Sequence, residues 1–92
     1  MSLLSNEEIQ KGISNLDGWE YADGSIKKTF LFDTYMDSIS FINLLAKEAE
    51  LANHHPDMHV GWCKINITFT SHDQGGVTAA CIKMAKQIDS II

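Results

Sequence analysis

The chain has 92 residues, a length that supports one hydrophobic core, so we expect a single domain over residues 1–92. Its 12 acidic and 7 basic residues give a formal charge of -5, which disfavours direct binding to nucleic acid. No apolar run approaches the ~20 residues that cross a bilayer, and the N-terminus lacks the basic-then-apolar pattern of a signal peptide. We therefore expect a cytoplasmic protein with no membrane partner.

The first part of the chain predicts a helix followed by a hairpin. Ser5, with Glu8 three residues later, has the pattern of a capping box, and apolar residues then recur at helical spacing over about 6–15. Asp23 and Gly24 stand between two strand-like runs, and this pair suits the positive φ angles of a tight hairpin turn. In the second run apolar residues alternate on both sides, which predicts that both faces of that strand are partly covered.

A long second helix gives the clearest pattern. Thr34 and Asp37 mark its start as a capping pair, and Pro56 excludes the helical conformation for the residue before it, so the helix ends near Asn53 or His54. One face is expected to carry Tyr35, Ile39, Ile42, Ala46 and Ala49. Further apolar residues widen this face, which favours either deep packing or a contact with another subunit: Phe41, Leu44 and Leu45.

The second half predicts two strands and a last helix. Residues 58–70 alternate as strands with a bend near Gly61, and the turn SHDQGG separates them from a helix that begins at Thr78. The face of that helix is expected to carry Cys81, Met84, Ala85, Ile88 and Ile92. The order α-β-β-α-β-β-α predicts an α+β fold in which helices pack on an antiparallel sheet.

Histidines are concentrated in the stretch NHHPDMH at 53–59. Their side chains exchange protons near neutral pH, so acid/base chemistry is one interpretation and a solvated loop without chemistry is the other. Metal binding is disfavoured, because the neighbouring side chains of His54 and His55 point apart and Pro56 prevents the helix that would align His55 with His59. We therefore expect no metal here, and none at the two cysteines, whose spacing matches no zinc motif.

The fourth histidine lies just past a predicted strand. His72 stands in a glycine-containing turn before the last helix, a place where sites commonly form at the rim of a sheet. A fold that brings this turn beside the histidine pair would gather three imidazoles around one pocket.

Several of these stretches together resemble one known family. They are AELANHHPDM at 49–58, KINITFTSHDQGGVT at 64–78, the GW at 18–19 and the strand SIKKTFLF at 25–32. This ordered set is similar to the pterin-4a-carbinolamine dehydratase family, whose signature is a Glu before His-His-Pro-acidic and a later Thr/Ser-His-x-x-x-Gly-aliphatic-Thr/Ser. The resemblance covers nearly the whole chain.

The resemblance implies a fold, a reaction and partners. The fold would be a four-stranded antiparallel sheet with three helices on one face, assembled as a homodimer or homotetramer. The reaction would be dehydration of 4a-hydroxytetrahydropterin to quinonoid dihydropterin without a cofactor, in the recycling that serves aromatic amino acid hydroxylases. A non-catalytic dimerisation or coactivator-type module is the alternative from another class, and a molybdopterin intermediate is an alternative substrate.

The resemblance also implies site residues. The catalytic set would be His54, His55 and His72, with one or another acting as acid according to which face of the pterin carries the hydroxyl. Substrate-binding positions would be Glu50, Pro56, Asp57 and Ser71, with Trp19 as a secondary aromatic wall. The two carboxylates either orient an imidazole or accept hydrogen bonds from the amino-pyrimidine edge, and solvated charges are the alternative. His59 is expected to be an ordinary strand residue.

One position departs from the family pattern. The family usually has an acidic residue three positions after the Ser/Thr, and here that position holds Cys81. Thr78 is still expected to cap the helix. If the usual acid only caps, its loss costs on the order of 1 kcal/mol. If it orients His72, Cys81 occupies an orienting position and turnover should be lower, unless Cys81 at the helix N-terminus ionises partly and substitutes for the acid.

Overall fold

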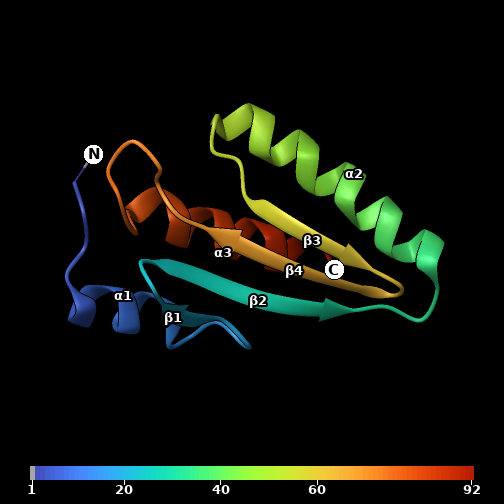
Figure 1. The fold of residues 1–92 in the computed structure, drawn as a ribbon, viewed down its shortest axis with the longest axis horizontal. Coiled ribbons are helices and arrows are strands. Elements are labelled where there is room, and N and C mark those ends of the chain that lie inside the picture. Colours follow the sequence, from blue (N-terminus) through green and yellow to red (C-terminus); the bar gives the residue numbers. More distant parts are fainter. Residues whose placement is uncertain (1) are drawn as a thin grey trace.

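A computed structural model describes residues 2–92 as three helices and four strands (Figure 1). In chain order they are α1 (Asn6–Ile13), β1 (Glu20–Ala22), β2 (Ser25–Leu31), α2 (Tyr35–Ala52), β3 (Asp57–Gly61), β4 (Lys64–Phe69) and α3 (Ala79–Ile91). The predicted α+β class and element order are confirmed. Within residues 2–92, no helix combines the length and the apolar composition needed to cross a bilayer.

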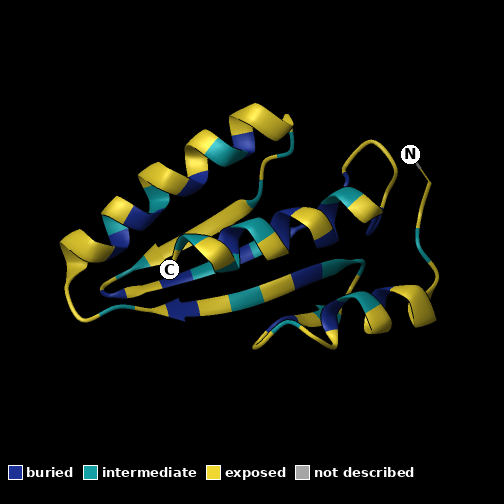
Figure 2. Cartoon of the chain, turned by 180° about the vertical axis from the view of Figure 1, so that it is seen from behind, coloured by how far each residue is buried: buried dark blue, intermediate teal, exposed yellow. Residues whose placement is uncertain are grey.

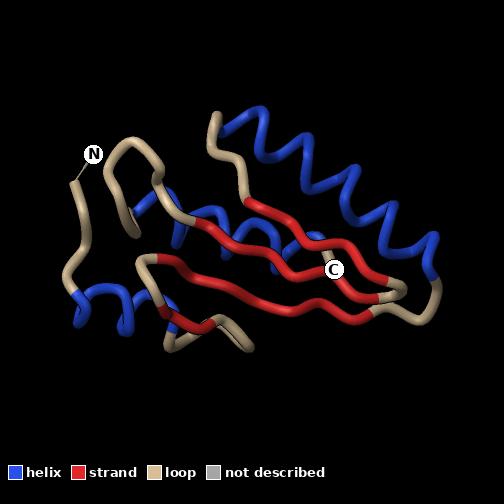
Figure 3. The backbone as a smooth tube through the Cα atoms, viewed as in Figure 1, coloured by secondary structure: helices blue, strands red, loops and turns tan. Residues whose placement is uncertain are grey.

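The four strands form one antiparallel sheet in the order β1-β2-β4-β3, and Figure 3 shows β2, β4 and β3 side by side. The predicted hairpin turn is present, with φ angles of 53° at Asp23 and 76° at Gly24. In the last strand pair Asp57 lies opposite Thr68. Because antiparallel strands run in opposite directions, this register places the start of β3 beside the end of β4.

The helices cover one face of the sheet, and α3 lies in front of the strands and runs roughly along them in the view from behind (Figure 2). The residues of β2 and β4 that face the helices are buried: Ile26, Phe30, Ile65, Ile67 and Phe69. The other face of β2 is open, because Leu31 is 75% exposed. The prediction that both faces of this strand are covered was therefore wrong.

The buried side of α2 differs from the predicted one. The residues that it buries are Ser38, Phe41, Leu45 and Ala49. Tyr35 and Ala46 are exposed instead, and so is Leu44, so the helix is not deeply packed. The prediction failed because α2 has apolar residues around much of its circumference, and sequence spacing alone did not determine which side meets the sheet.

The helix ends follow local capping rules with one exception. Ser5 and Glu8 form the predicted capping box, and the Thr34 side chain accepts a hydrogen bond from the Asp37 N–H at 3.0 Å. The first helix ends at Ile13, two residues before the predicted end. Thr78 precedes α3 but makes no side-chain capping bond, which corrects that expectation. Ile92 was predicted to share the buried face of α3 but is exposed. Ile82, which was not predicted on that face, is buried.

Candidate functional site

The end of α2 fixes the backbone of the histidine pair. Asn53 adopts a left-handed conformation (φ 50°, ψ 43°) and its N–H donates to the Glu50 carbonyl at 3.2 Å. The next N–H, of His54, reaches back to the Ala49 carbonyl at 3.0 Å. These two bonds are those of a Schellman-type helix end, for which asparagine is suited because it tolerates the left-handed region. His54 therefore leaves the helix at a defined point and in a defined direction.

His55 faces a carboxylate from the last turn of the same helix. Its Nε2 hydrogen bonds to Oε2 of Glu50, and the His55 side chain is 51% exposed. A carboxylate accepts hydrogen bonds only, so this contact places the ring hydrogen on Nε2. Glu50 therefore orients the ring and leaves Nδ1 on its other side.

His72 reaches the same region from the loop between β4 and α3. The loop is closed by Ser71 and Gly76, whose backbone groups pair at 2.8 Å, and His72 is the first residue of the turn between them. Nε2 of His72 lies 3.7 Å from Oδ2 of Asp57, at the start of β3. The strand register explains this proximity, because Asp57 is opposite Thr68, close to where β4 leads into the loop.

His54 is the most enclosed of the three imidazoles. Its ring stacks on Phe69 with the centroids 5.7 Å apart and the planes 9° from parallel. Its Nε2 lies 3.4 Å from Sγ of Cys81, in the first turn of α3. Burial lowers the pKa of His54 below its ordinary value of 6.5. The charge of Asp73 opposes this shift, whereas the positive charges of two other histidines, His55 and His72, add to it.

His55 follows His54 directly in the chain, and His72 is held beside Asp57, two residues after His55. The arrangement of the three imidazoles around one pocket stays a prediction. A cavity of about 260 Å³ lies beside the first of them and is lined by Ala52, His54, Ala79, Ala80, Lys83 and Met84. His55 and His72 are outside that lining and are mostly open to solvent.

Two of the predicted substrate-binding residues are buried instead. Ser71 is 5% exposed, and its hydroxyl is 2.7 Å from that of Thr78. Trp19 is also 5% exposed and packs against Phe30 and Phe69. Neither presents a surface to a substrate. Pro56 is partly buried and directly precedes β3.

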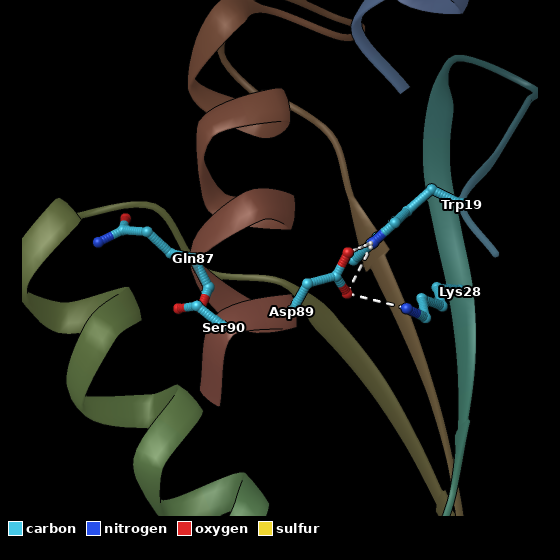
Figure 4. Close-up of polar contacts among 5 residues, drawn as sticks. All are labelled: Trp19, Lys28, Gln87, Asp89 and Ser90. Atoms are coloured by element: carbon cyan, nitrogen blue, oxygen red, sulfur yellow. Dashed lines mark hydrogen bonds and ion pairs between the residues drawn. The ribbon is translucent and has the colours of Figure 1, made fainter. Parts of the chain in front are cut away.

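Figure 4 shows what Trp19 does instead. Its indole N–H donates to both carboxylate oxygens of Asp89 at 3.0 and 3.1 Å, and the ammonium group of Lys28 lies 2.9 Å from the same carboxylate. This network joins the last turns of α3 to β2. Trp19 is therefore a structural residue of the core.

Cys81 contacts a different histidine from the predicted one. Its sulfur lies against His54 and not against His72, since α3 begins beside the end of α2 and His72 is on the exposed side of the loop. The orienting hypothesis therefore applies to His54. Sequence reasoning also missed Phe69 and Asn53; Asn53, the last residue before the histidine pair, was the available signal for a left-handed helix end.

Among residues 2–92, no three His, Cys, Asp or Glu side chains are grouped so that they could hold a metal ion. The arrangement instead offers three imidazoles, each with a partner: a thiol for His54 and a carboxylate for each of the other two. Such a set can exchange protons with one small molecule.

The model of the family "Pterin 4 alpha carbinolamine dehydratase" matches residues 2–91. The chain belongs to the pterin-4a-carbinolamine dehydratase family. The resemblance first seen in the histidine motifs is thereby confirmed over nearly the whole chain.

Similar members of this dehydratase family come from several bacteria. A protein of Mycolicibacterium vanbaalenii, named "Putative pterin-4-alpha-carbinolamine dehydratase", is 33% identical over 92 residues, covering all of this chain and 99% of its own. One of the same name from Aquifex aeolicus is 38% identical over 89 residues, with coverages of 97% and 90%. A crystal structure of a "transcriptional coactivator/pterin dehydratase" from Brucella melitensis superposes with a TM-score of 0.92 at 30% identity and covers 96% of both chains.

Proposed function

We propose that this chain dehydrates a 4a-hydroxytetrahydropterin to quinonoid dihydropterin and water, as part of tetrahydropterin recycling. The observation that carries the proposal is that the loop after β4 brings His72 to 3.7 Å from Asp57, two residues after the His54–His55 pair, so imidazoles of two separate segments flank one region. Membership of the dehydratase family supports the same reaction. The product would return to the reductive step that serves aromatic amino acid hydroxylases.

The reaction needs proton transfer at two atoms. The carbon–oxygen bond at position 4a breaks, and an acid supplies the proton with which the hydroxyl departs as water. The lone pair of the adjacent ring nitrogen forms the new double bond to carbon, and a base removes the hydrogen from that nitrogen. Acid and base then exchange protons with solvent, so no other reactant is consumed. Each positioned group typically contributes about 10²- to 10⁴-fold in rate.

The surroundings of the histidines suggest how the roles divide. His54 is suited to act as the base, because burial keeps its pKa low and it is neutral at pH 7. We assign the acid role to His55 and His72, because each is open to solvent, which can return its proton after turnover, and each faces a carboxylate that orients its ring. With acids on two segments, the site would serve a hydroxyl on either face of the ring.

The two carboxylates also provide substrate contacts. Glu50 uses Oε2 for His55 and Asp57 uses Oδ2 for His72, so each retains a second oxygen. A pterin carries amino and ring N–H donors on its pyrimidine edge, and these can donate to such oxygens. We propose that Glu50 and Asp57 bind that edge, together with Pro56, which lies between α2 and β3. A molybdopterin intermediate, the alternative substrate, would present a similar edge.

The test is stopped-flow measurement of carbinolamine dehydration in the presence of a metal chelator. Wild type is compared with a His54→Ala/His55→Ala double variant and with His59→Ala, which removes an exposed imidazole on β3. We expect the double variant to lose at least about 10²-fold in turnover and the His59 variant to keep it. Equal rates for wild type and the double variant would overturn the assignment, and loss of wild-type rate on chelation would indicate a metal-dependent site.

A second property concerns α2. Met36, Leu44 and Leu51 lie about two helical turns apart, so they share one stripe opposite the buried side, and Leu51 is 83% exposed. An exposed apolar stripe of this kind favours association with an equivalent helix of another subunit. The Brucella melitensis relative is described as a transcriptional coactivator as well as a pterin dehydratase, which is consistent with a role in protein contacts.

We therefore propose that the chain is a homo-oligomer held partly through α2. Sedimentation velocity of wild type, Leu44→Glu and Leu51→Glu checks this, with Lys11→Glu as a charge-changing control at an exposed position of α1, outside this stripe. We expect the leucine variants to sediment as smaller species. A monomeric wild type would contradict the proposal.

A further inference from the structure

Cys81 on α3 contacts the imidazole that we propose as the base, that of His54. Its sulfur is 3.4 Å from Nε2 of His54, is fully buried and lies in the first turn of the helix. The stacking on Phe69 fixes the plane of the imidazole from its face, and the thiol contacts it at an edge. The nitrogen that faces Cys81 is therefore turned toward the protein interior, and Nδ1 is the nitrogen left to meet a substrate.

The thiol is held in turn by two buried hydroxyls. Oγ of Ser71 lies 3.6 Å from the sulfur, and Oγ1 of Thr78 lies 3.9 Å from it; the two oxygens are 2.7 Å apart. The side chain of Thr78 does not cap α3, so its hydroxyl is available to hydrogen bond with Ser71 and Cys81. The S–H can therefore donate to Ser71, and the Ser71 hydroxyl to Thr78, leaving sulfur lone pairs for His54.

The geometry points to Cys81 as the positioning residue of His54: its sulfur accepts a hydrogen bond from Nε2–H, so that Nδ1 carries the lone pair that takes the substrate proton. A neutral imidazole has one ring hydrogen, and a base must present its bare nitrogen to the proton that it removes. With the S–H directed at Ser71, the sulfur offers Nε2 only its lone pairs, so the hydrogen belongs on Nε2. This inference rests on the proposed dehydratase function for its catalytic part only.

The polarity of Cys81 also determines how basic His54 is. A neutral thiol orients the ring without attracting a positive charge, and the positive end of α3 disfavours an imidazolium. The charged or titratable groups near His54 are His55 after α2, His72 and Asp73 in the loop after β4, and Lys83 on α3. Asp73 is the only one of these that favours protonation, so an acid at position 81 would change the balance.

The experiment uses the full-length chain with ¹⁵N-labelled histidine. Long-range ¹H–¹⁵N spectra identify the tautomer of His54, and a pH titration gives its pKa, both independently of turnover. The variants are Cys81→Ala, Cys81→Ser and Cys81→Asp, and Cys63→Ala is the control because Cys63 is the other buried cysteine and lies in the turn between β3 and β4. Pre-steady-state dehydration rates are measured across pH for each.

We expect wild-type His54 to be a single Nε2–H tautomer, and Cys81→Ala to give a mixture with a roughly tenfold lower turnover, part of the effect of one positioned base. Cys81→Ser should restore the tautomer and most of the rate. Cys81→Asp should keep the tautomer and move the acid limb of the pH–rate profile to higher pH by about one unit or more. The Cys63 variant should match wild type.

Two results would overturn the positioning role: a wild-type Nδ1–H tautomer, or identical tautomer populations in wild type and Cys81→Ala. If wild type shows the Nε2–H tautomer with the expected Cys81 dependence but dehydrates no pterin, the proposed function fails and the positioning contact stands. If dehydration proceeds with the opposite tautomer, the function stands and this inference fails.

Discussion

The two ends of α3 make polar contacts of different kinds. At its start, the fully buried thiol of Cys81 meets the partly buried imidazole of His54. Near its end, Asp89 meets Trp19 and Lys28 through a charged network whose two ionised side chains remain about one fifth exposed (Figure 4).

This difference separates two tasks. Hydrogen bonds to a carboxylate are roughly twice as strong as neutral ones, so Asp89 is suited to fasten α3 to β2. A carboxylate against His54 would hold a proton on that ring, whereas a thiol leaves it free to gain and lose one. The contact that fastens α3 to β2 is therefore charged, whereas the contact of α3 with the imidazole of His54 is made by a thiol.

The largest effect is expected from removing the imidazole of His54, which contacts the first turn of α3. His54→Ala should lower the rate of carbinolamine dehydration by about 10²- to 10⁴-fold, because it removes the proposed base. Stopped-flow absorbance gives the rate, and urea unfolding should show a smaller loss of stability than any variant of Asp89. A His54→Ala protein that unfolds at a lower urea concentration than the Asp89 variants but keeps the wild-type rate would contradict this prediction.

At the other end of α3, Asp89→Ala should act on stability. The indole N–H of Trp19 would remain buried without its acceptor, so the free energy of unfolding should fall by about 1–3 kcal/mol. Asp33→Ala, which removes an exposed carboxylate before α2, serves as the control in the same urea series. Turnover per folded molecule should be unchanged, and a tenfold loss would show that the anchor also shapes the site.

The pH dependence sharpens the comparison further. Because the pKa of His54 is lowered in the folded protein, its neutral form persists below pH 6.5, and the acid limb of the rate profile should have its midpoint below that value. The same shift makes folding favour the neutral ring, so this contribution to stability is complete above pH 6.5 and is lost as the pH falls. A ¹H NMR titration of the ring measures the pKa, and His54→Gln should abolish the signal.

The smallest effect is expected at Lys28. Lys28→Met removes one charge from the network but leaves the Trp19 bond to Asp89 in place. Because the pair is partly exposed, the loss of unfolding free energy should be at most about 1 kcal/mol and should shrink in high salt. Urea unfolding at two salt concentrations measures it; a loss equal to that of Asp89→Ala would mean that the ion pair, not the indole bond, fastens the helix.

Local rules explain why much of the fold was predictable from the sequence. The capping box at Ser5, the hairpin turn at Asp23 and the paired strands around Gly61 each depend on residues close together in the chain. The histidines were recognisable as a set because their motif is ordered along the sequence. Their partners at Glu50 and Asp57 were candidates for the same reason.

The errors concern contacts between distant segments. Spacing on α2 did not show which side meets the sheet, because apolar residues surround the helix. The histidine contacted by Cys81 and the partner of Trp19 depend on where α3 lies, which no local pattern encodes. An indole can line a ligand pocket or a core, and the burial of Trp19 against Phe30 and Phe69, with its bond to Asp89, decided for the core.

The left-handed residue at the end of α2 has a consequence for the range of sequences that this site accepts. Asn53 can be exchanged for glycine with little strain, whereas a β-branched residue there would resist the positive φ angle. The strain would be relieved at the neighbouring backbone bonds, which set the exit of His54 and the last turn that carries Glu50. Asn53, for which we propose no substrate contact, therefore controls the orientation of His54 and of Glu50 through the backbone. Variants of this loop have to preserve the backbone angles of residue 53.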